Sequence, residues 1–314
     1  MPIFENSVVL DLTRGVKAFL SLKVGVTRGQ VPIQRQTNGQ RQQVETNKKQ
    51  IDQKESAENH LKNGPAQRSD TPVPGNVIHD GLLLPPKNMR PCGPKYKDDE
   101  FYLNSARERA NILVNQLGLS AESRLLDVGS GPGRLAIGIL DRVGEIRRYC
   151  GVDVVEESTR WGWKNITSQH PNFQFFHIDV ENRRYNPGVA QSDSDFVFPF
   201  GDHEFDIVTL HSVFTHMLTD GVRAYLKEFQ RILRPEGRIH LTAFIEEGVP
   251  DVEENPEGYL GREWEGDLYC VRYEREFFEG LLDEAGFKLD HFAPSTGQEQ
   301  GEWGQRGVFI SKKS

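Results

Sequence analysis

The sequence has few of the features that mark metal proteins, disulfide-rich proteins and membrane proteins. Its three cysteines, Cys92, Cys150 and Cys270, have no metal-ligand spacing and do not form an even disulfide set. No apolar run approaches the roughly 20 residues that span a bilayer, and charged residues interrupt the apolar stretch near the N-terminus. We therefore expect a cytoplasmic protein with reduced thiols, no resident metal, no transmembrane segment and no secretory signal.

Aromatic residues are missing from a long part of the chain, since none occurs between Phe19 and Tyr96. Within that part, residues 27–75 are rich in Gln, Asn, Lys and Ser. Segments of such low hydrophobicity cannot offset the entropy lost on ordering. We predict a disordered linker over 27–75, and with it a largely disordered N-terminal extension.

Residues 1–26 form a short amphipathic segment within that extension. Their apolar side chains recur at helical spacings: Val8, Leu12, Val16, Phe19 and Leu20. Two interpretations stay open, a helix that packs on its own domain and a helix that docks on a protein partner. Association with a membrane surface is a third.

Positive charge is scarce in the last two thirds of the chain. Residues 1–100 contain 15 Lys and Arg against 11 Asp and Glu, a net charge of +4, whereas residues 101–314 contain 23 against 35, a net charge of −12. Phosphate backbones are bound mainly through Lys and Arg. This balance argues against a nucleic-acid partner and favours a small-molecule substrate.

A glycine turn is the most informative motif. Residues 125–133 read Leu-Leu-Asp-Val-Gly-Ser-Gly-Pro-Gly, and a helix-compatible apolar stretch comes next. This pattern predicts a strand, a tight turn and a helix start, where backbone N–H groups face a ligand. The spacing is GxGxG, not the GxGxxG of dinucleotide enzymes, and the P-loop pattern is absent.

Apolar segments alternate with helical ones over residues 76–314, which we predict to be one domain. Strands are expected near 124–128, 148–152, 173–178, 205–210, 237–244, 287–292 and 306–311, and helices near 104–117, 132–141, 156–168, 219–233 and 274–285. Asn104 or Ser105 is the expected cap of the first helix. The alternation predicts an α/β fold with a doubly wound, mostly parallel, seven-stranded sheet, which binds ligands beyond the carboxyl ends of its strands.

Five segments in this order resemble the motifs of the class I S-adenosylmethionine (SAM)-dependent methyltransferases. They are the acid-x-Gly-x-Gly-x-Gly pattern at 127–133, the second strand at 149–153, the third at 175–180, the run into the fourth at 198–208 and the turn into the fifth at 233–238. In the last, Glu236 replaces a glycine of the family. The resemblance covers roughly residues 100–314 and implies a methyltransferase with SAM as its cofactor.

The resemblance also implies a set of cofactor-binding residues: Asp127, Gly129, Gly131, Gly133, Asp153, Asp179, Val180 and His211. Asp153 ends the second strand, where a carboxylate accepts hydrogen bonds from two ribose hydroxyls. Asp179 and Val180 would flank the adenine. For Asp127 and Asp179 a simpler interpretation stays open, a turn residue that bonds its own backbone.

Three residues are candidates for catalysis. His211 comes directly after the fourth strand, so we expect it to act as a general base or substrate contact. His216 lies one turn further, where a structural role is the alternative. Glu246 comes after the fifth strand and is an alternative base. Many methyltransferases need no base, since the cofactor brings the reactive group.

The acceptor remains the least specified part of the site. Residues 245–272 form a long insertion with three aromatic residues among many acids, which we interpret as a lid or substrate loop. A solvated acidic loop is the alternative. The fourth-strand region lacks the Asp/Asn-Pro-Pro-Tyr/Phe motif of amino-methylating enzymes. We therefore expect an oxygen nucleophile, such as a sugar or another hydroxylated compound.

Several other functions stay open on the sequence alone. The first is methylation of a protein or an RNA, and the second is a methyltransferase-like domain that serves as a non-catalytic scaffold. The third is an NAD-dependent oxidoreductase, against which the GxGxG spacing and the missing Tyr-x-x-x-Lys pattern argue.

Overall fold

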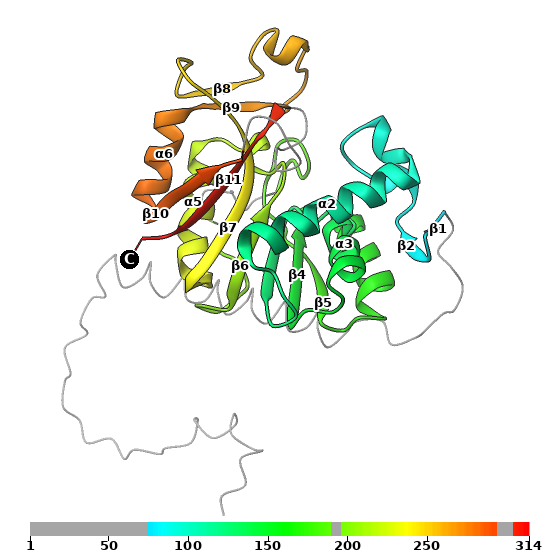
Figure 1. Cartoon of the computed structure of the whole chain (residues 1–314). Coiled ribbons are helices and arrows are strands. Elements are labelled where there is room, and N and C mark those ends of the chain that lie inside the picture. The colour runs from blue at the N-terminus through cyan, green and yellow to red at the C-terminus, as the bar shows by residue number, and fades with distance from the viewer. Residues whose placement is uncertain (1–74, 190–195, 294–303, 314) are drawn as a thin grey trace, which may run out of the picture. The chain divides into compact units, whose positions relative to one another are not determined.

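The computed structural model describes residues 75–189, 196–293 and 304–313 (Figure 1). The predictions for residues 1–26 and for nearly all of 27–75 lie outside these ranges. The α-helices are α2 (Asp99–Leu117), α3 (Arg134–Arg142), α4 (Glu156–Gly162), α5 (Thr219–Ile232) and α6 (Arg275–Glu284). The strands are β1 (Val77–His79), β2 (Leu82–Leu84), β3 (Arg124–Val128), β4 (Arg148–Asp153), β5 (Phe173–His177), β6 (Phe205–Leu210), β7 (Leu233–Glu246), β8 (Val252–Glu254), β9 (Val271–Glu274), β10 (Phe287–Phe292) and β11 (Arg306–Lys312).

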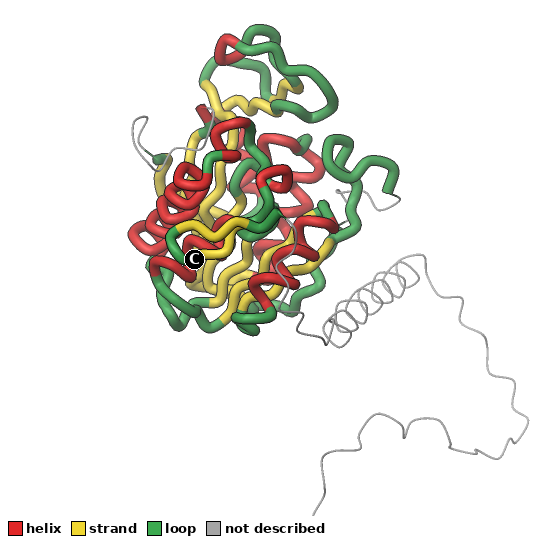
Figure 2. Tube along the Cα trace, turned by 90° about the vertical axis from the view of Figure 1, so that its right-hand side faces the viewer, coloured by secondary structure: helices red, strands yellow, loops and turns green. Residues whose placement is uncertain are grey.

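The main sheet confirms the predicted fold class. Seven strands lie in the order β10-β11-β7-β6-β3-β4-β5, and the five from β7 to β5 are parallel. Only β11 runs against its neighbours on this path, pairing antiparallel with both β7 and β10. Short β9 pairs in parallel with the end of β7, and β8 pairs antiparallel with β9. Figure 2 shows the strands of the sheet in yellow with helices in red on either side.

Two apolar clusters cover the two faces of the sheet. Successive strand residues point to opposite faces, so Leu125 of β3 packs with α2 and α3, whereas Leu126 packs with α5 and α6. The same split separates Tyr149 from Cys150 on β4. Figure 1 shows α2 and α3 crossing the near side of the strands. The fully buried strands therefore carry apolar residues on both faces, as expected for a parallel sheet.

The structure differs from the sequence-based expectations in three places. Helix α2 begins at Asp99 rather than near 104, because Asp98 caps it by accepting a hydrogen bond from Phe101 N at 2.8 Å. The segment before it contains a hairpin, β1–β2, where we expected no strand. The turn expected at 233–238 is an irregularity at the start of β7, where the register with β6 jumps from Leu233 to Arg238.

In the part of the chain that the structure describes, no helix combines the length and the hydropathy needed to cross a membrane.

Candidate functional site

A cavity of about 890 Å³ lies at the carboxyl ends of the parallel strands. This is the position at which open α/β sheets bind their ligands. The structure brings most of the predicted site residues into its lining: Asp127, Gly129, Gly131, Asp153, Val180, His211 and His216. Of the predicted residues, Gly133, Asp179 and Glu246 do not belong to that lining.

The glycine loop is held by hydrogen bonds to the end of β4. The backbone N–H groups of Gly129 and Ser130 both donate to the Val152 carbonyl, at 2.9 and 3.0 Å. Asp153 accepts from Gly131 N at 2.7 Å through Oδ2 and from Val155 N at 2.8 Å through Oδ1. These contacts fix the loop against the strand end and orient the Asp153 carboxylate beside it.

Asp127 lies beneath the loop and is almost completely buried, with 5% of its surface exposed. Tyr149 donates a hydrogen bond from its hydroxyl to Asp127 Oδ2 at 2.6 Å. Burial raises the pKa of Asp127 to about 7, although the Tyr149 bond and the charge of Arg109 act in the opposite direction. The protonation state of the Asp127 carboxyl group therefore changes near pH 7 and is sensitive to a nearby cation.

Gly133 serves packing rather than the cavity wall. Its φ of +91° belongs to the left-handed region, which glycine tolerates best. A Cβ on Gly133 would lie 2.8 Å from Ile166 Cδ1 and 2.9 Å from Phe175 Cζ. The start of α3 therefore approaches the elements around β5 as closely as it does because no side chain intervenes.

The two predicted site residues after β5, Asp179 and Val180, differ in their exposure. Val180 is buried and lines the cavity. Asp179 is exposed, and its Oδ1 accepts a hydrogen bond from Asn186 Nδ2 at 3.1 Å. That bond links two side chains of the loop of residues 179–186, and the role of Asp179 beside the adenine stays a prediction.

The segment after β6 places His211 in the cavity wall, half-buried. The next residue, Ser212, has φ of +56°, an uncommon conformation for a residue with a side chain. Its backbone N–H donates to Thr242 Oγ1 at 2.9 Å, and its hydroxyl lies 2.9 Å from Gln305 Nε2. Thr242 in turn donates to Gln305 Oε1 at 2.6 Å. This network ties the residue beside His211 to β7 and to the start of β11.

His216 lines the same cavity and is held by its neighbours. Its Nδ1 lies 2.9 Å from the Leu268 carbonyl. Because a carbonyl only accepts, Nδ1 carries the proton and Nε2 remains an acceptor in the neutral ring. Burial lowers the pKa of His216 to about 4, so the ring is neutral at pH 7.

Glu246 lies at the end of β7, away from the cavity lining. Its Oε1 accepts a hydrogen bond from the Tyr259 hydroxyl at 2.9 Å. Tyr259 belongs to the insertion at 245–272, which contains β8 and the short 3-10 helix η6 (Tyr259–Gly261). Trp264 of the same segment donates from Nε1 to the Tyr259 carbonyl at 2.9 Å. The insertion contributes Arg262, Glu263, Trp264 and Tyr269 to the cavity wall.

Sequence reasoning missed several polar residues of the cavity lining, among them Arg109, Arg184 and Gln305. For Arg109 a signal exists, because it lies three residues after Ala106 and four before Leu113, on the apolar face of α2. A charged residue on an apolar helix face indicates either burial with a partner or a site. Arg184 and Gln305 lie in irregular segments and carry no such periodic signal.

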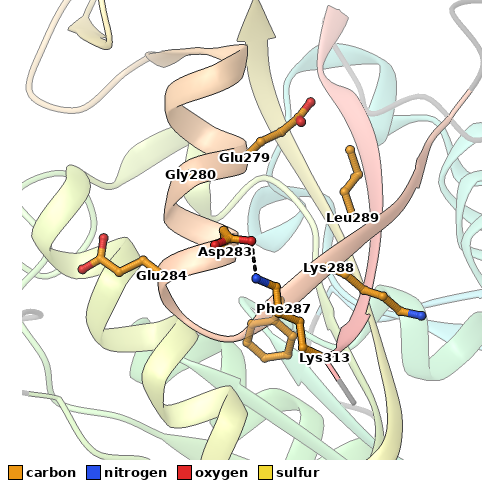
Figure 3. Close-up of a pocket in the computed structure, with 8 residues that line it drawn as sticks. All are labelled: Glu279, Gly280, Asp283, Glu284, Phe287, Lys288, Leu289 and Lys313. Atoms are coloured by element: carbon orange, nitrogen blue, oxygen red, sulfur yellow. Dashed lines mark hydrogen bonds and ion pairs between the residues drawn. The ribbon is translucent and has the colours of Figure 1, made fainter.

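A second depression lies on the surface between α6 and β10 (Figure 3). Asp283 forms an ion pair with Lys313 across it. None of the predicted site residues contributes to this depression. Its acidic side chains lie on an exposed helix face, where charged residues are common because water solvates them.

The fold and the cavity together define a Rossmann-like protein with an acid-flanked glycine loop, and comparison with known proteins shows what part of it is similar to. Residues 126–241 match a family model described as a methyltransferase domain. The uncharacterized methyltransferase YcgJ of Bacillus subtilis (strain 168) is 30% identical over 146 residues, which cover 46% of this chain and 49% of the relative. The chain thus spans about half the length of that relative.

Two further proteins extend this comparison. The ubiquinone/menaquinone biosynthesis C-methyltransferase UbiE of Citrifermentans bemidjiense is 24% identical over 203 residues, covering 59% of this chain and 80% of the relative. The structure of Burkholderia thailandensis 1,6-didemethyltoxoflavin-N1-methyltransferase with bound 1,6-didemethyltoxoflavin and S-adenosylhomocysteine is 20% identical, with a TM-score of 0.47 and coverage of 68% of this chain and 80% of that one. The matched stretch, residues 126–241, is therefore similar to a methyltransferase domain.

Proposed function

We propose that this chain transfers the methyl group of SAM to a small-molecule acceptor, and that the accepting atom is an oxygen. One observation carries this proposal: a single cavity is lined both by the glycine loop with its two acids and by the histidines and aromatic residues of the later loops. Cofactor and acceptor can therefore meet in one enclosed space, as methyl transfer requires.

The residues at the glycine loop fit SAM chemically. A carboxylate has about four acceptor positions, and Asp153 uses two of them for Gly131 N and Val155 N. The remaining positions suit the two ribose hydroxyls. A Cβ on Gly131 would meet nothing closer than Pro91 Cγ at 4.0 Å, which leaves room above the loop for the methionine part. We expect Val180, which lines the same cavity, to flank the adenine.

SAM supplies a methyl group that its sulfonium already makes electrophilic. The protein then has to align the acceptor, exclude water and hold or remove a proton. We assign proton removal to His211, which comes directly after β6 and lines the cavity. His216 is the second candidate, because its neutral ring keeps Nε2 as an acceptor toward a hydroxyl.

The segment after β6 supports an oxygen acceptor. The chain reads Leu210-His211-Ser212-Val213 there, without the amide and prolines that bind an exocyclic amine in amino-methylating enzymes. Carbon and nitrogen acceptors remain outcomes of the test, since two of the similar proteins are a C-methyltransferase and an N1-methyltransferase.

The first experiment is calorimetric titration of S-adenosylhomocysteine into wild-type protein and Asp153→Ala. We expect micromolar binding that weakens by about 1–3 kcal/mol in the variant, the size of a lost hydrogen bond to a charged group. Asp220→Asn, on the exposed side of α5, is the matched control and should bind as wild type does. Absence of binding to wild-type protein contradicts the proposal.

The second experiment identifies the acceptor class. Protein and SAM labelled in the methyl group are incubated with an extract of the source cells, which is then separated by size. We expect the label in the small-molecule fraction, and an oxygen–methyl bond in the purified product by NMR. Label in the protein or RNA fraction would support the alternative substrates, and a carbon–methyl or nitrogen–methyl bond would replace the assignment to oxygen.

A further inference from the structure

Arg184 is a cation on the cavity wall whose partners are aromatic rings rather than carboxylates. It lies in the loop after β5 and lines the cavity. Its guanidinium carbon is 3.8 Å from the centroid of the Tyr269 ring and 5.1 Å from that of the Tyr185 ring. Stacking of this kind positions a guanidinium without using its hydrogen-bond donors.

Those donors are not matched by an acid. Among the described residues no carboxylate lies within 4.0 Å of the Arg184 nitrogens, and its buried Nε has no hydrogen-bond partner there. The neighbouring Arg183 provides the contrast, because it points outward and forms an ion pair with Glu254 at 2.8 Å. Two acids, Glu181 and Glu263, line the same cavity but make no ion pair with Arg184. Guanidinium groups remain charged in proteins, so an inward one without a carboxylate favours an anionic partner.

The wall beside Arg184 is aromatic. The Trp264 ring centroid is 5.8 Å from that of Phe244 and 5.9 Å from that of Tyr269, and all three line the cavity. The hydrogen bond from Trp264 Nε1 to the Tyr259 carbonyl fixes the indole orientation. Aromatic walls with one fixed polar group are typical of sites for flat organic ligands.

This corner also adjoins a candidate catalytic residue. The Tyr185 ring packs edge-on against His216, with 5.5 Å between the ring centroids. The chain of contacts from Arg184 through Tyr185 to His216 therefore connects the cation to the part of the cavity where we expect the acceptor hydroxyl.

We propose that the acceptor is an aromatic carboxylic acid, with its ring against the wall of Phe244, Trp264 and Tyr269 and its carboxylate bound by Arg184. This inference rests on the function proposed above and specifies the acceptor of the same site. Arg184 would act as a specificity-determining residue, selecting the acid over neutral analogues of the same shape.

The test uses the full-length protein saturated with S-adenosylhomocysteine. A panel of mono- and bicyclic hydroxylated aromatic carboxylates is titrated, each beside its neutral carboxamide. We expect at least one acid to bind wild-type protein about tenfold or more tightly than its amide, and Arg184→Gln to lose that preference. Arg184→Lys, which keeps the charge but not the planar fork, should keep part of it. Arg183→Gln is the matched control and should keep the full preference.

The outcomes separate this inference from the proposed function. If no acid is preferred over its amide by wild-type protein, or if the preference survives in Arg184→Gln, the assignment of Arg184 is overturned. Titration of S-adenosylhomocysteine into each variant gives the second readout, which should match wild type. Failure of the wild-type protein to bind S-adenosylhomocysteine contradicts the proposed function itself.

Discussion

Two carboxylates flank the glycine loop and have different surroundings. Asp153 accepts from two backbone N–H groups, whereas the deeply buried Asp127 accepts from the Tyr149 hydroxyl. Burial raises the pKa of both, and for Asp127 the value reaches about 7. A buried acid of this kind lowers the stability of the free protein, a cost that is common at binding sites.

Asp127→Asn is expected to stabilise the free protein in a pH-dependent manner. The folded pKa of about 7 exceeds the ordinary aspartate value of 3.8, so the wild-type protein loses stability as pH rises from about 4 through 7. Asparagine removes this loss and can still accept from Tyr149. We expect a gain on the order of 1–3 kcal/mol at pH 8 and a smaller one at pH 5, measured by urea denaturation at both pH values. Equal changes at the two pH values would show that ionisation of Asp127 is not the cause.

A short sequence motif predicts a local element well where the backbone needs a conformation that few residue types adopt. The three glycines at 129–133 all have positive φ, between +54° and +91°, so the alternate glycines predicted the turn for a sound stereochemical reason. The insertion at 245–272 was less predictable, because β8 and β9 exist only by pairing with each other and, for β9, with β7. A strand of four residues, such as β9, is too short to show a periodic pattern of apolar residues, and its pairing with distant segments is not visible in its own sequence.

Gly133→Ala and Gly131→Ala are expected to affect the loop differently. A methyl group at 133 meets Ile166 and Phe175 below 3.0 Å, whereas at 131 the space is open. We predict that Gly133→Ala costs on the order of 1–3 kcal/mol of unfolding free energy, and that Gly131→Ala costs less but weakens S-adenosylhomocysteine binding. Urea denaturation and calorimetry of both variants provide the comparison. Similar stability losses would mean that the packing around Gly133 relaxes.

At the scale of the whole molecule, both apolar clusters are formed by residues between Leu84 and Ile310. They lie on the two faces of one sheet, as the prediction of a single domain over 76–314 requires. That boundary and the role of residues before it stay predictions.

A protein that begins at residue 75 is therefore expected to fold and to bind S-adenosylhomocysteine within about twofold of the full chain, since the cavity lining begins at Asn88. Thermal unfolding and calorimetry of the two proteins check this. A loss of about tenfold or more in affinity would place part of the first 74 residues at the site. Unchanged affinity would favour a role for those residues in binding a partner or in tethering the domain.

The sequence by itself determined the order of strands along the chain, the glycine turn and the resemblance to methyltransferases, because each depends on short-range patterns of apolar residues, glycines and acids. It also placed Asp127, Asp153 and His211 at strand ends. Only the tertiary structure decided which side chains face the cavity. Gln305 reaches Ser212 across 93 residues of sequence, and Arg184 meets Tyr269 from another loop. Contacts between distant irregular segments are set by the packing of the sheet that carries them, and no local pattern encodes them.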